Sequence, residues 1–261
     1  MQLFSIHHER YAWLVAASTI AGVMNAMAGG GSFLSFPAML GMGVPPVQAN
    51  ATNTVALWPG QLTSLATLRD DVRRDILPTV VATCVVGGVS GAEVLLHTRQ
   101  RTFLHLIPWL ILMGTVIFGV SGPLSKWMRR RSMDQRAQPP IRVVPLALAL
   151  FPICFYIGYF GAGGGLLVMT VLALFGMESI HAMNAMKVVA ATTSNLCAIV
   201  TFIVRGAIVW HYCIVSMFFA ALGGWIGARF ARRMNGDVLR MVVVATGCVV
   251  AGYFFWTQRH G

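Results

Sequence analysis

The stretch AGVMNAMAGGGS, residues 21–32, ends a long apolar segment with three consecutive glycines. The pattern occurs once more in the chain, and the two glycine runs are Gly29, Gly30 and Gly31, and Gly163, Gly164 and Gly165. An Asn-Ala pair follows each run, and Asn50 and Asn184 are separated by 134 positions, as are the middle glycines of the runs. Later matches, such as Gly91 with Gly227, are separated by 136 positions. The ordered series of matches predicts that the chain is a duplicated unit.

The composition is that of a protein that lies in a membrane. Of the 261 residues, 57% are hydrophobic and 10% are charged, whereas charged residues make up about 25% of ordinary soluble domains. The mean hydropathy is +0.72. Ten uncharged runs are candidates to enter or cross a bilayer: residues 11–28, 33–43, 47–68, 76–92, 106–124, 143–160, 166–177, 188–204, 212–228 and 241–257. We therefore expect an all-α polytopic membrane protein, in which eight of these runs are long enough to span.

The two runs that directly follow the triple glycines, residues 33–43 and 166–177, are too short to cross. Eleven or twelve residues of helix extend about 17 Å, against a hydrocarbon core of about 30 Å. We predict that they are Gly-broken short helices at the centre of the molecule. The expected organisation is a first transmembrane repeat (1–125), a basic cytoplasmic loop (126–142) and a second transmembrane repeat (143–261). An odd number of crossings in each repeat makes the duplication an inverted one.

The net charge of +11 comes from basic residues in the loops between apolar runs, which indicates membrane orientation rather than nucleic-acid binding. With the central loop in the cytoplasm, 13 basic residues lie inside, five lie outside, and both chain termini face out. An alternative with eight spans and cytoplasmic termini gives 12 against six. Both arrangements stay open.

The glycine runs are the first part of a candidate binding site. A break in a helix inside the bilayer leaves backbone groups unpaired, so it survives only when buried in protein or beside a hydrated cavity. The helix that begins after the break presents the positive end of its dipole, and glycine leaves the N–H groups open to a solute. We therefore expect the two runs to bind a small anion near the middle of the membrane. The alternative is that the glycines serve only close helix packing.

Polar residues follow each glycine run at a matching distance and extend this candidate site. The two clusters are Asn50, Thr52, Asn53 and Thr54 in the first half, and Asn184, Lys187, Thr192, Thr193, Ser194 and Asn195 in the second. From them we select Asn50, Asn53, Thr54, Asn184, Lys187 and Thr193 as site candidates. Neutral donors can replace the hydration shell of an oxyanion, although such residues also hold membrane helices together. Lys187 occupies the position that Asn53 has in the first repeat and is the expected countercharge for an anion. Its alternative role is to extend its amine to the membrane interface.

Two other kinds of residue bear on the chemistry. Glu93 is the one acid within a long apolar stretch, and it is either a proton carrier or an interface residue that pairs with Arg99 or Arg101. The five cysteines are isolated within apolar runs, without the paired spacing of a zinc or redox site. We expect neither a metal site nor a cofactor.

The motifs around both glycine runs resemble those of the TauE/SafE sulfite exporter family. They are AGVMNAMAGGGS (21–32), PAML (37–40), GVPP (43–46), ANATN (49–53), GYFGAGGG (158–165) and AMNAMK (182–187). The resemblance implies a multi-pass permease of the inner (plasma) membrane that carries a small sulfur-containing or organic anion, such as sulfite or sulfoacetate, often with proton coupling. Many members have a small residue in place of Asn50. Whether the chain forms a homodimer stays open.

Two other functions are weighed against transport. Gly-x-Ser-Gly occurs at residues 88–91 and 119–122, as in intramembrane serine proteases, but no histidine lies centrally in an apolar run to act as the base. We therefore do not expect an enzyme. A non-transporting membrane scaffold or assembly factor is the second alternative, and the clustered Asn, Thr and Lys residues argue against it.

Overall fold

The computed structural model describes residues 2–27, 30–132, 141–177, 179–231 and 236–260. These ranges form helices and contain no β-strand. The elements are α1 (Gln2–Met27), α2 (Ser32–Gly41), α3 (Pro46–Leu57), α4 (Pro59–Thr67), the 3-10 turn η1 (Arg69–Asp71), α5 (Leu77–His97), α6 (Gln100–Ser132), α7 (Val143–Tyr159), α8 (Gly164–Leu174), α9 (Ile180–Val204), α10 (Trp210–Ala231) and α11 (Gly236–His260). The predicted all-α class is confirmed.

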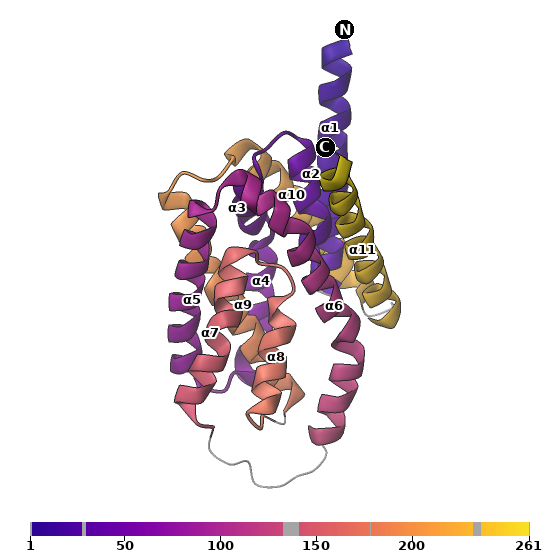
Figure 1. Ribbon diagram of the computed structural model, residues 1–261. Coiled ribbons are helices and arrows are strands. Elements are labelled where there is room, and N and C mark those ends of the chain that lie inside the picture. Colours follow the sequence, from indigo (N-terminus) through magenta and orange to yellow (C-terminus); the bar gives the residue numbers. More distant parts are fainter. Residues whose placement is uncertain (1, 28–29, 133–140, 178, 232–235, 261) are drawn as a thin grey trace.

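The two halves of the chain begin at opposite ends of the molecule. In Figure 1, α1 starts at the upper end and α7 at the lower end. Both termini lie at the upper end, together with the α5–α6 and α9–α10 connections, whereas the α4–α5 and α8–α9 connections lie at the lower end (Figure 1). An inverted repeat predicts this arrangement, and the repeat itself stays a prediction.

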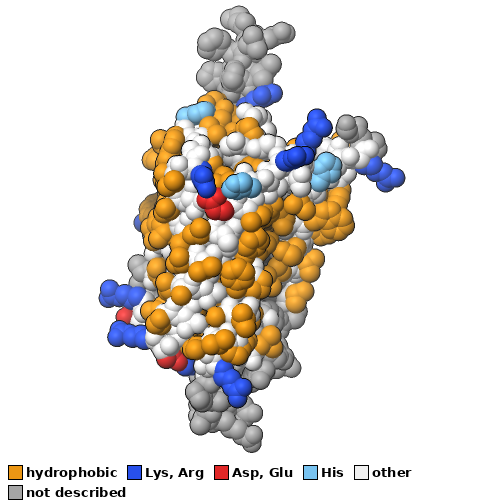
Figure 2. Space-filling model, turned by 60° about the vertical axis from the view of Figure 1, so that its left-hand side comes forward, with side chains coloured by type: hydrophobic (Ala, Val, Ile, Leu, Met, Phe, Trp, Pro, Cys, Tyr) orange, Lys and Arg blue, Asp and Glu red, His pale blue; other side chains and the backbone are white. Residues whose placement is uncertain are grey.

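The surface between the two ends is apolar. Charged side chains gather near the ends, and hydrophobic side chains cover much of the face between them (Figure 2). Within the described ranges, five segments are long and apolar enough to cross a membrane: Leu77–His97, Gln100–Ile117, Ile180–Val204, Trp210–Gly227 and Met241–Arg259. Their large exposed side chains include Trp109, Phe218 and Val249. A surface of this kind faces lipid, because a soluble monomer rarely exposes such large apolar patches. The chain is a multi-pass membrane protein.

Five of the eight runs that were expected to span meet this measure within the described residues. The apolar run 47–68 is broken into α3 and α4, with Pro59 as the first residue of α4. Proline has no N–H to donate to the carbonyl of Val55, and its ring crowds that carbonyl, which favours a break at this position, although α2 and α7 continue through Pro37 and Pro152. α7 has only 17 residues, and α1 is also absent from the five.

The helices that follow the glycine runs are short, as expected. α2 has 10 residues and α8 has 11, which corresponds to about 15 and 17 Å of helix. Gly163, directly before α8, has a φ of 80°, a left-handed conformation that glycine adopts without strain. Gly31, before α2, has a φ of −59°. The two glycine runs therefore differ in local backbone conformation.

Glycines allow two helix pairs to touch backbone to backbone. α5 packs on α7, and α10 packs on α1, and these are the two most extensive helix contacts in the structure. A methyl group at Gly91 would overlap the carbonyl oxygen of Phe155, and one at Gly227 would lie 2.9 Å from the Cα of Val23. Gly91 and Gly227 are a pair that the sequence spacing of 136 predicts. The close contacts therefore occur at corresponding places in the two halves.

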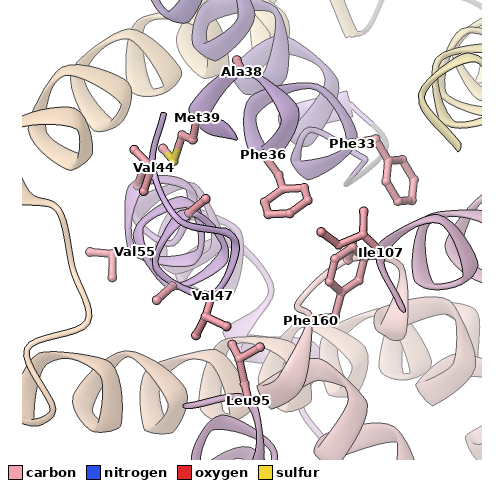
Figure 3. Close-up of a cluster of buried hydrophobic side chains, with 14 of the residues drawn as sticks. Phe33, Phe36, Ala38, Met39, Val44, Val47, Val55, Leu95, Ile107 and Phe160 are labelled. Carbon is pink, nitrogen blue, oxygen red and sulfur yellow. The ribbon is translucent and has the colours of Figure 1, made fainter. Parts of the chain in front are cut away.

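A buried apolar cluster joins the two halves near these contacts (Figure 3). Phe36 of α2 lies edge-on to Phe103 of α6, with ring centroids 6.4 Å apart, and to Phe160, which directly follows α7, at 6.1 Å. Val47 of α3 and Leu95 of α5 belong to the same cluster. Edge-to-face pairs of aromatic rings of this kind are worth about 0.5–1.5 kcal/mol each. The cluster fixes α2, α3 and α6 against the end of α7 and thereby positions the loop that leads to α8.

Candidate functional site

A cavity of about 350 Å³ lies between α4 and the helices α7, α8 and α9, with the end of α1 at its edge. Both halves of the chain contribute to its lining. The residues are Asn25, Ala26, Gly60, Gln61, Ser64 and Leu68 from the first half, and Ile157, Gly161, Gly163, Gly165, Leu166, Asn184, Lys187, Val188, Ala191, Thr192 and Asn195 from the second. Small-molecule sites are commonly about 300–1,000 Å³, so this cavity has the size of a solute site.

Among the described residues that line the cavity, Lys187 carries the only charged side chain. It lies on α9, seven residues after the helix starts at Ile180, and Asn184 precedes it by one turn on the same side. A methyl group at Gly165 would lie 3.1 Å from the Cγ of Lys187, so the missing side chain makes room for the lysine stem. Within the described residues, Lys187 forms no ion pair. A cation in such a place favours an anionic partner.

Two further polar groups of α9 are buried at the cavity without a protein partner. The hydroxyl of Thr192 and the Oδ1 of Asn195 form no hydrogen bond within the described part of the chain, and both residues are at most 4% exposed. The Nδ2 of Asn195 donates to the Oε1 of Gln61 on α4, at 3.0 Å. Buried polar groups without partners are costly, so these two atoms are available to a bound solute or to water. Thr193 follows in sequence but does not line the cavity.

Two contacts at or beside the cavity join residues at the repeat spacing. Gln61 and Asn195 are 134 positions apart, and so are Trp58 and Thr192, whose indole N–H and backbone carbonyl lie 3.3 Å from each other. Matching positions of two repeats meet only near the axis that relates the repeats. Sequence reasoning placed Asn195 in the polar cluster without selecting it as a site residue, and it missed Gln61, although the spacing that pairs them was already visible.

The predicted polar residues of α3 lie outside the cavity lining. The Nδ2 of Asn50 donates to the carbonyl of Tyr159 at 3.1 Å, and the hydroxyl of Thr54 donates to the carbonyl of Asn50 at 2.9 Å. Asn53 accepts a hydrogen bond from the hydroxyl of Ser35, with 2.5 Å between the oxygens. These bonds satisfy the side chains within the protein, and they connect α3 to α2 and to the end of α7.

The second glycine run contributes directly to the cavity. Gly163 and Gly165 belong to the lining, and Gly161, two residues earlier, does so as well. A methyl group at Gly161 would lie 3.6 Å from the Oδ1 of Asn195. Gly164 instead packs against the side chain of Ile157, where an added methyl group would overlap it.

The first glycine run has a different environment. Gly30 packs against Val243 of α11, and Gly31 packs against the carbonyl of Ala21 in α1. Gly29 lies outside the described residues. The cavity lining includes Asn25 and Ala26, which precede this run, but neither Gly30 nor Gly31. The structure therefore brings only the second run to the cavity.

Glu93 lies away from the cavity and forms an ion pair at the end of α5. Arg205 donates to its Oε1 through Nε at 3.2 Å and through Nη2 at 3.1 Å, and His97 lies 3.7 Å from its Oε2. The expected partners were Arg99 and Arg101, so that expectation is corrected. Arg205 follows α9 directly, so the ion pair joins the ends of α5 and α9.

A multi-pass helical protein with a solute-sized cavity between its two halves, and an unpaired cation in that cavity, has the features of a membrane transporter. The comparison with known proteins agrees with this class. The chain belongs to the family Sulfite exporter TauE/SafE, which it matches over residues 14–254. The resemblance seen in the motifs is thereby confirmed over nearly the whole chain, and it points to a transporter rather than an enzyme.

Similar proteins carry names of the same kind. The chain is 26% identical over 255 residues to the "Probable membrane transporter protein YfcA" of Escherichia coli K12, covering 95% of this chain and 90% of that protein. It is 27% identical over 251 residues to the "Probable membrane transporter protein ORF9" of Sinorhizobium sp, covering 92% and 90%. A "Probable membrane transporter protein" of Haemophilus influenzae is 27% identical over 250 residues, covering 94% of each. No solved structure matches the chain.

Proposed function

We propose that this protein is a secondary transporter that binds a small anion, a sulfur oxyanion or an organosulfonate, in the cavity at Lys187. The observation that carries the proposal is the position of Lys187. Lys187 lies on the membrane-crossing segment Ile180–Val204, its side chain lines the cavity, and no described carboxylate pairs with it. An ammonium group that is partly buried inside a membrane protein is costly unless it is paired, and an oxyanion is a partner of opposite charge that the solution can supply.

The start of α8 adds to the attraction for an anion. Gly163 and Gly165 lie at the cavity, and the first N–H groups of a helix have no partner within that helix. The helix dipole places partial positive charge at the same end, worth about 0.3–1 kcal/mol for a nearby anion. Glycine leaves these N–H groups accessible, because no side chain covers them.

Neutral groups would complete the coordination of the anion. The hydroxyl of Thr192 can donate, and Asn184 presents an amide at the same cavity. Asn195 can donate through its amide nitrogen if its amide and that of Gln61 turn together, because Gln61 then donates to Asn195 and the hydrogen bond between them is kept. Sulfite and the sulfonates carry three oxygens, which makes several weak donors around one cation a suitable set.

Alternating access would follow from the two halves of the chain moving against one another. The cavity lies where α4 of the first half meets α9 of the second, so relative rotation would change its opening. Lys187 is the one titratable group among the described lining residues, so a proton coupled at this cavity would be carried by its ammonium group. We place the protein in the inner membrane of a bacterial cell.

The experiment is anion binding and flux with purified protein. Sulfite, sulfate, chloride and acetate are tested by thermal shift, and sulfite uptake is measured in proteoliposomes. Lys187→Met removes the charge and keeps the length of the side chain, and Thr201→Ala, on the same helix but away from the cavity, is the matched control. We expect the apparent affinity for sulfite, measured by thermal shift, to be at least tenfold lower in Lys187→Met than in the unaltered protein. The affinity of Thr201→Ala should be unchanged.

A scaffold or assembly factor would give a different result. A transporter that binds an anion should be stabilised by about 2.7 kcal/mol when the anion is present at 100 times its Kd. A scaffold would show no such stabilisation with any of the anions. Equal sulfite affinity in Lys187→Met and the unaltered protein would also refute the proposed site.

A further inference from the structure

A second cavity of about 500 Å³ adjoins the first and lies between α1, the α3–α4 break and α10. Four residues, Asn25, Ala26, Gly60 and Ser64, line both cavities. The remaining walls are apolar and include Leu57, Pro59, Met217, Ala220, Ala221 and Trp225. None of the lining residues of this second cavity carries a charge.

We propose that the second cavity holds the organic part of the transported anion while its charged group lies at Lys187. The inference rests on the proposed function and names the substrate class more closely. The substrate is an amphiphilic anion, a sulfonate that carries an apolar group of several carbons, rather than a bare inorganic ion. The polar and apolar cavities together would then form one binding site with two compartments.

The division of polar groups between the compartments supports this substrate class. Lys187, Asn184 and Thr192 line only the first cavity, whereas Leu57 and Trp225 line only the second. A bare oxyanion gains nothing from apolar walls, and it loses hydration there without compensation. An alkyl or aryl group gains contact with those walls while it remains attached to the charged group.

The wall that the two cavities share is narrow and made of small residues. Gly60 has no side chain, and a methyl group there would lie 3.7 Å from the Nδ2 of Asn25. Ala26 and Ser64 are also small. Since the polar atoms at the junction belong to Asn25 and Ser64, a sulfonate can keep hydrogen bonds on one side while its carbon chain extends to the other.

Trp225, which lines the second cavity, is held in place by a neighbour on α10. The guanidinium carbon of Arg229 lies 3.8 Å from the ring centroid of Trp225, a cation–π contact. This contact holds the indole plane, so the indole offers a fixed apolar surface to the organic part of the substrate.

The test compares sulfite with methane-, ethane-, butane- and benzenesulfonate on the unaltered protein by thermal shift and isothermal titration. We expect affinity to rise with the organic group, by up to about fourfold for each added methylene that is fully buried. The series needs no variant, so it does not depend on how a variant folds.

Two variants of α10 then place the organic group. Ala221→Phe adds a ring to the wall of the second cavity, whereas Leu222→Phe, its neighbour, changes an exposed side chain that does not line the cavity. We expect Ala221→Phe to weaken butanesulfonate and benzenesulfonate at least tenfold and sulfite less than twofold. Leu222→Phe should change neither.

The outcomes separate the two proposals. If sulfite binds through Lys187 but affinity does not rise along the series, the proposed function stands and the apolar compartment is refuted. Butanol is an uncharged competitor of the same length as butanesulfonate. If butanol displaces butanesulfonate as efficiently as a second sulfonate does, the cavity binds lipid or detergent tails, and the apolar compartment is again refuted. If no anion binds, both proposals fail.

Discussion

Replacement of Gly91 by alanine is expected to force α5 away from α7. A methyl group at this position would overlap the carbonyl oxygen of Phe155, and it would lie 2.8 Å from the amide nitrogen of Tyr159 and 3.1 Å from the carbonyl carbon of Gly158. All three are backbone atoms of α7 or of its end, so none can rotate away as a flexible side chain would. Ordinary carbon contacts are about 3.5–4.0 Å, and the helices must therefore separate.

The magnitude follows from the cost of overpacking. Extra methyl groups in a well-packed interior cost about 1–3 kcal/mol, and the backbone environment of Gly91 places it towards the upper end. The control is Gly252→Ala in α11, because a methyl group there meets nothing within 4 Å. Both substitutions gain the same preference of alanine for helix, about 1 kcal/mol, so this term cancels in the comparison.

The assay is unfolding of the purified proteins in detergent, followed by circular dichroism, with size-exclusion chromatography to confirm dispersity. We expect Gly91→Ala to be less stable than Gly252→Ala by about 1–3 kcal/mol. Equal stability of the two variants would refute the direct backbone contact between α5 and α7.

Three smaller perturbations test other contacts. In a double-mutant cycle of Gln61→Ala and Asn195→Ala, thermal unfolding should give a coupling of about 0.6 kcal/mol, and additivity would contradict the hydrogen bond across the cavity. Glu93→Gln should cost about 0.5–1 kcal/mol at low salt and less at 1 M salt, with an unchanged pH profile of transport; a changed profile would favour the proton-carrier role. The ion pair with Arg73 lowers the pKa of Asp75, so its stabilisation, at most about 0.5 kcal/mol at this exposed site, is present at neutral pH and is lost as pH falls through that pKa. The free energy of unfolding of Asp75→Asn should therefore differ from that of the unaltered protein at pH 7, and the difference should shrink as the pH falls below the ordinary pKa of an aspartate.

Much of the fold could be predicted because the physical signals are local. Apolar runs and the two glycine runs are visible in the sequence, and α2 and α8 have the short lengths that the runs indicate. The break at Pro59 was missed, since the run 47–68 was judged by its apolar side chains. Its signal was the missing N–H of proline, which hydropathy does not measure.

The candidate site was accessible only in part. Repeat spacing and residue chemistry both pointed to four residues that do line the cavity: Asn184, Lys187, Gly163 and Gly165. The side chain of Asn50 lies outside the cavity lining and donates a hydrogen bond to the carbonyl of Tyr159, which is 109 positions away in the sequence. No local pattern indicates which distant carbonyl an amide will find, so ligands and packing residues could not be separated before the helices were placed.

The pairing of Gln61 with Asn195 bears on how such a molecule could arise. If a single ancestral unit once assembled with its own copy in the opposite membrane orientation, the residue at this position met itself across the symmetry axis. An amide suits that place, because it carries both a donor and an acceptor and is therefore complementary to itself. Gene fusion would then have let the two positions change independently, and Gln61 and Asn195 differ only by one methylene. Trp58 and Thr192 are unlike each other. The indole of Trp58 contacts the backbone carbonyl of residue 192, which is present with any side chain, so this contact would not have constrained the residue type there.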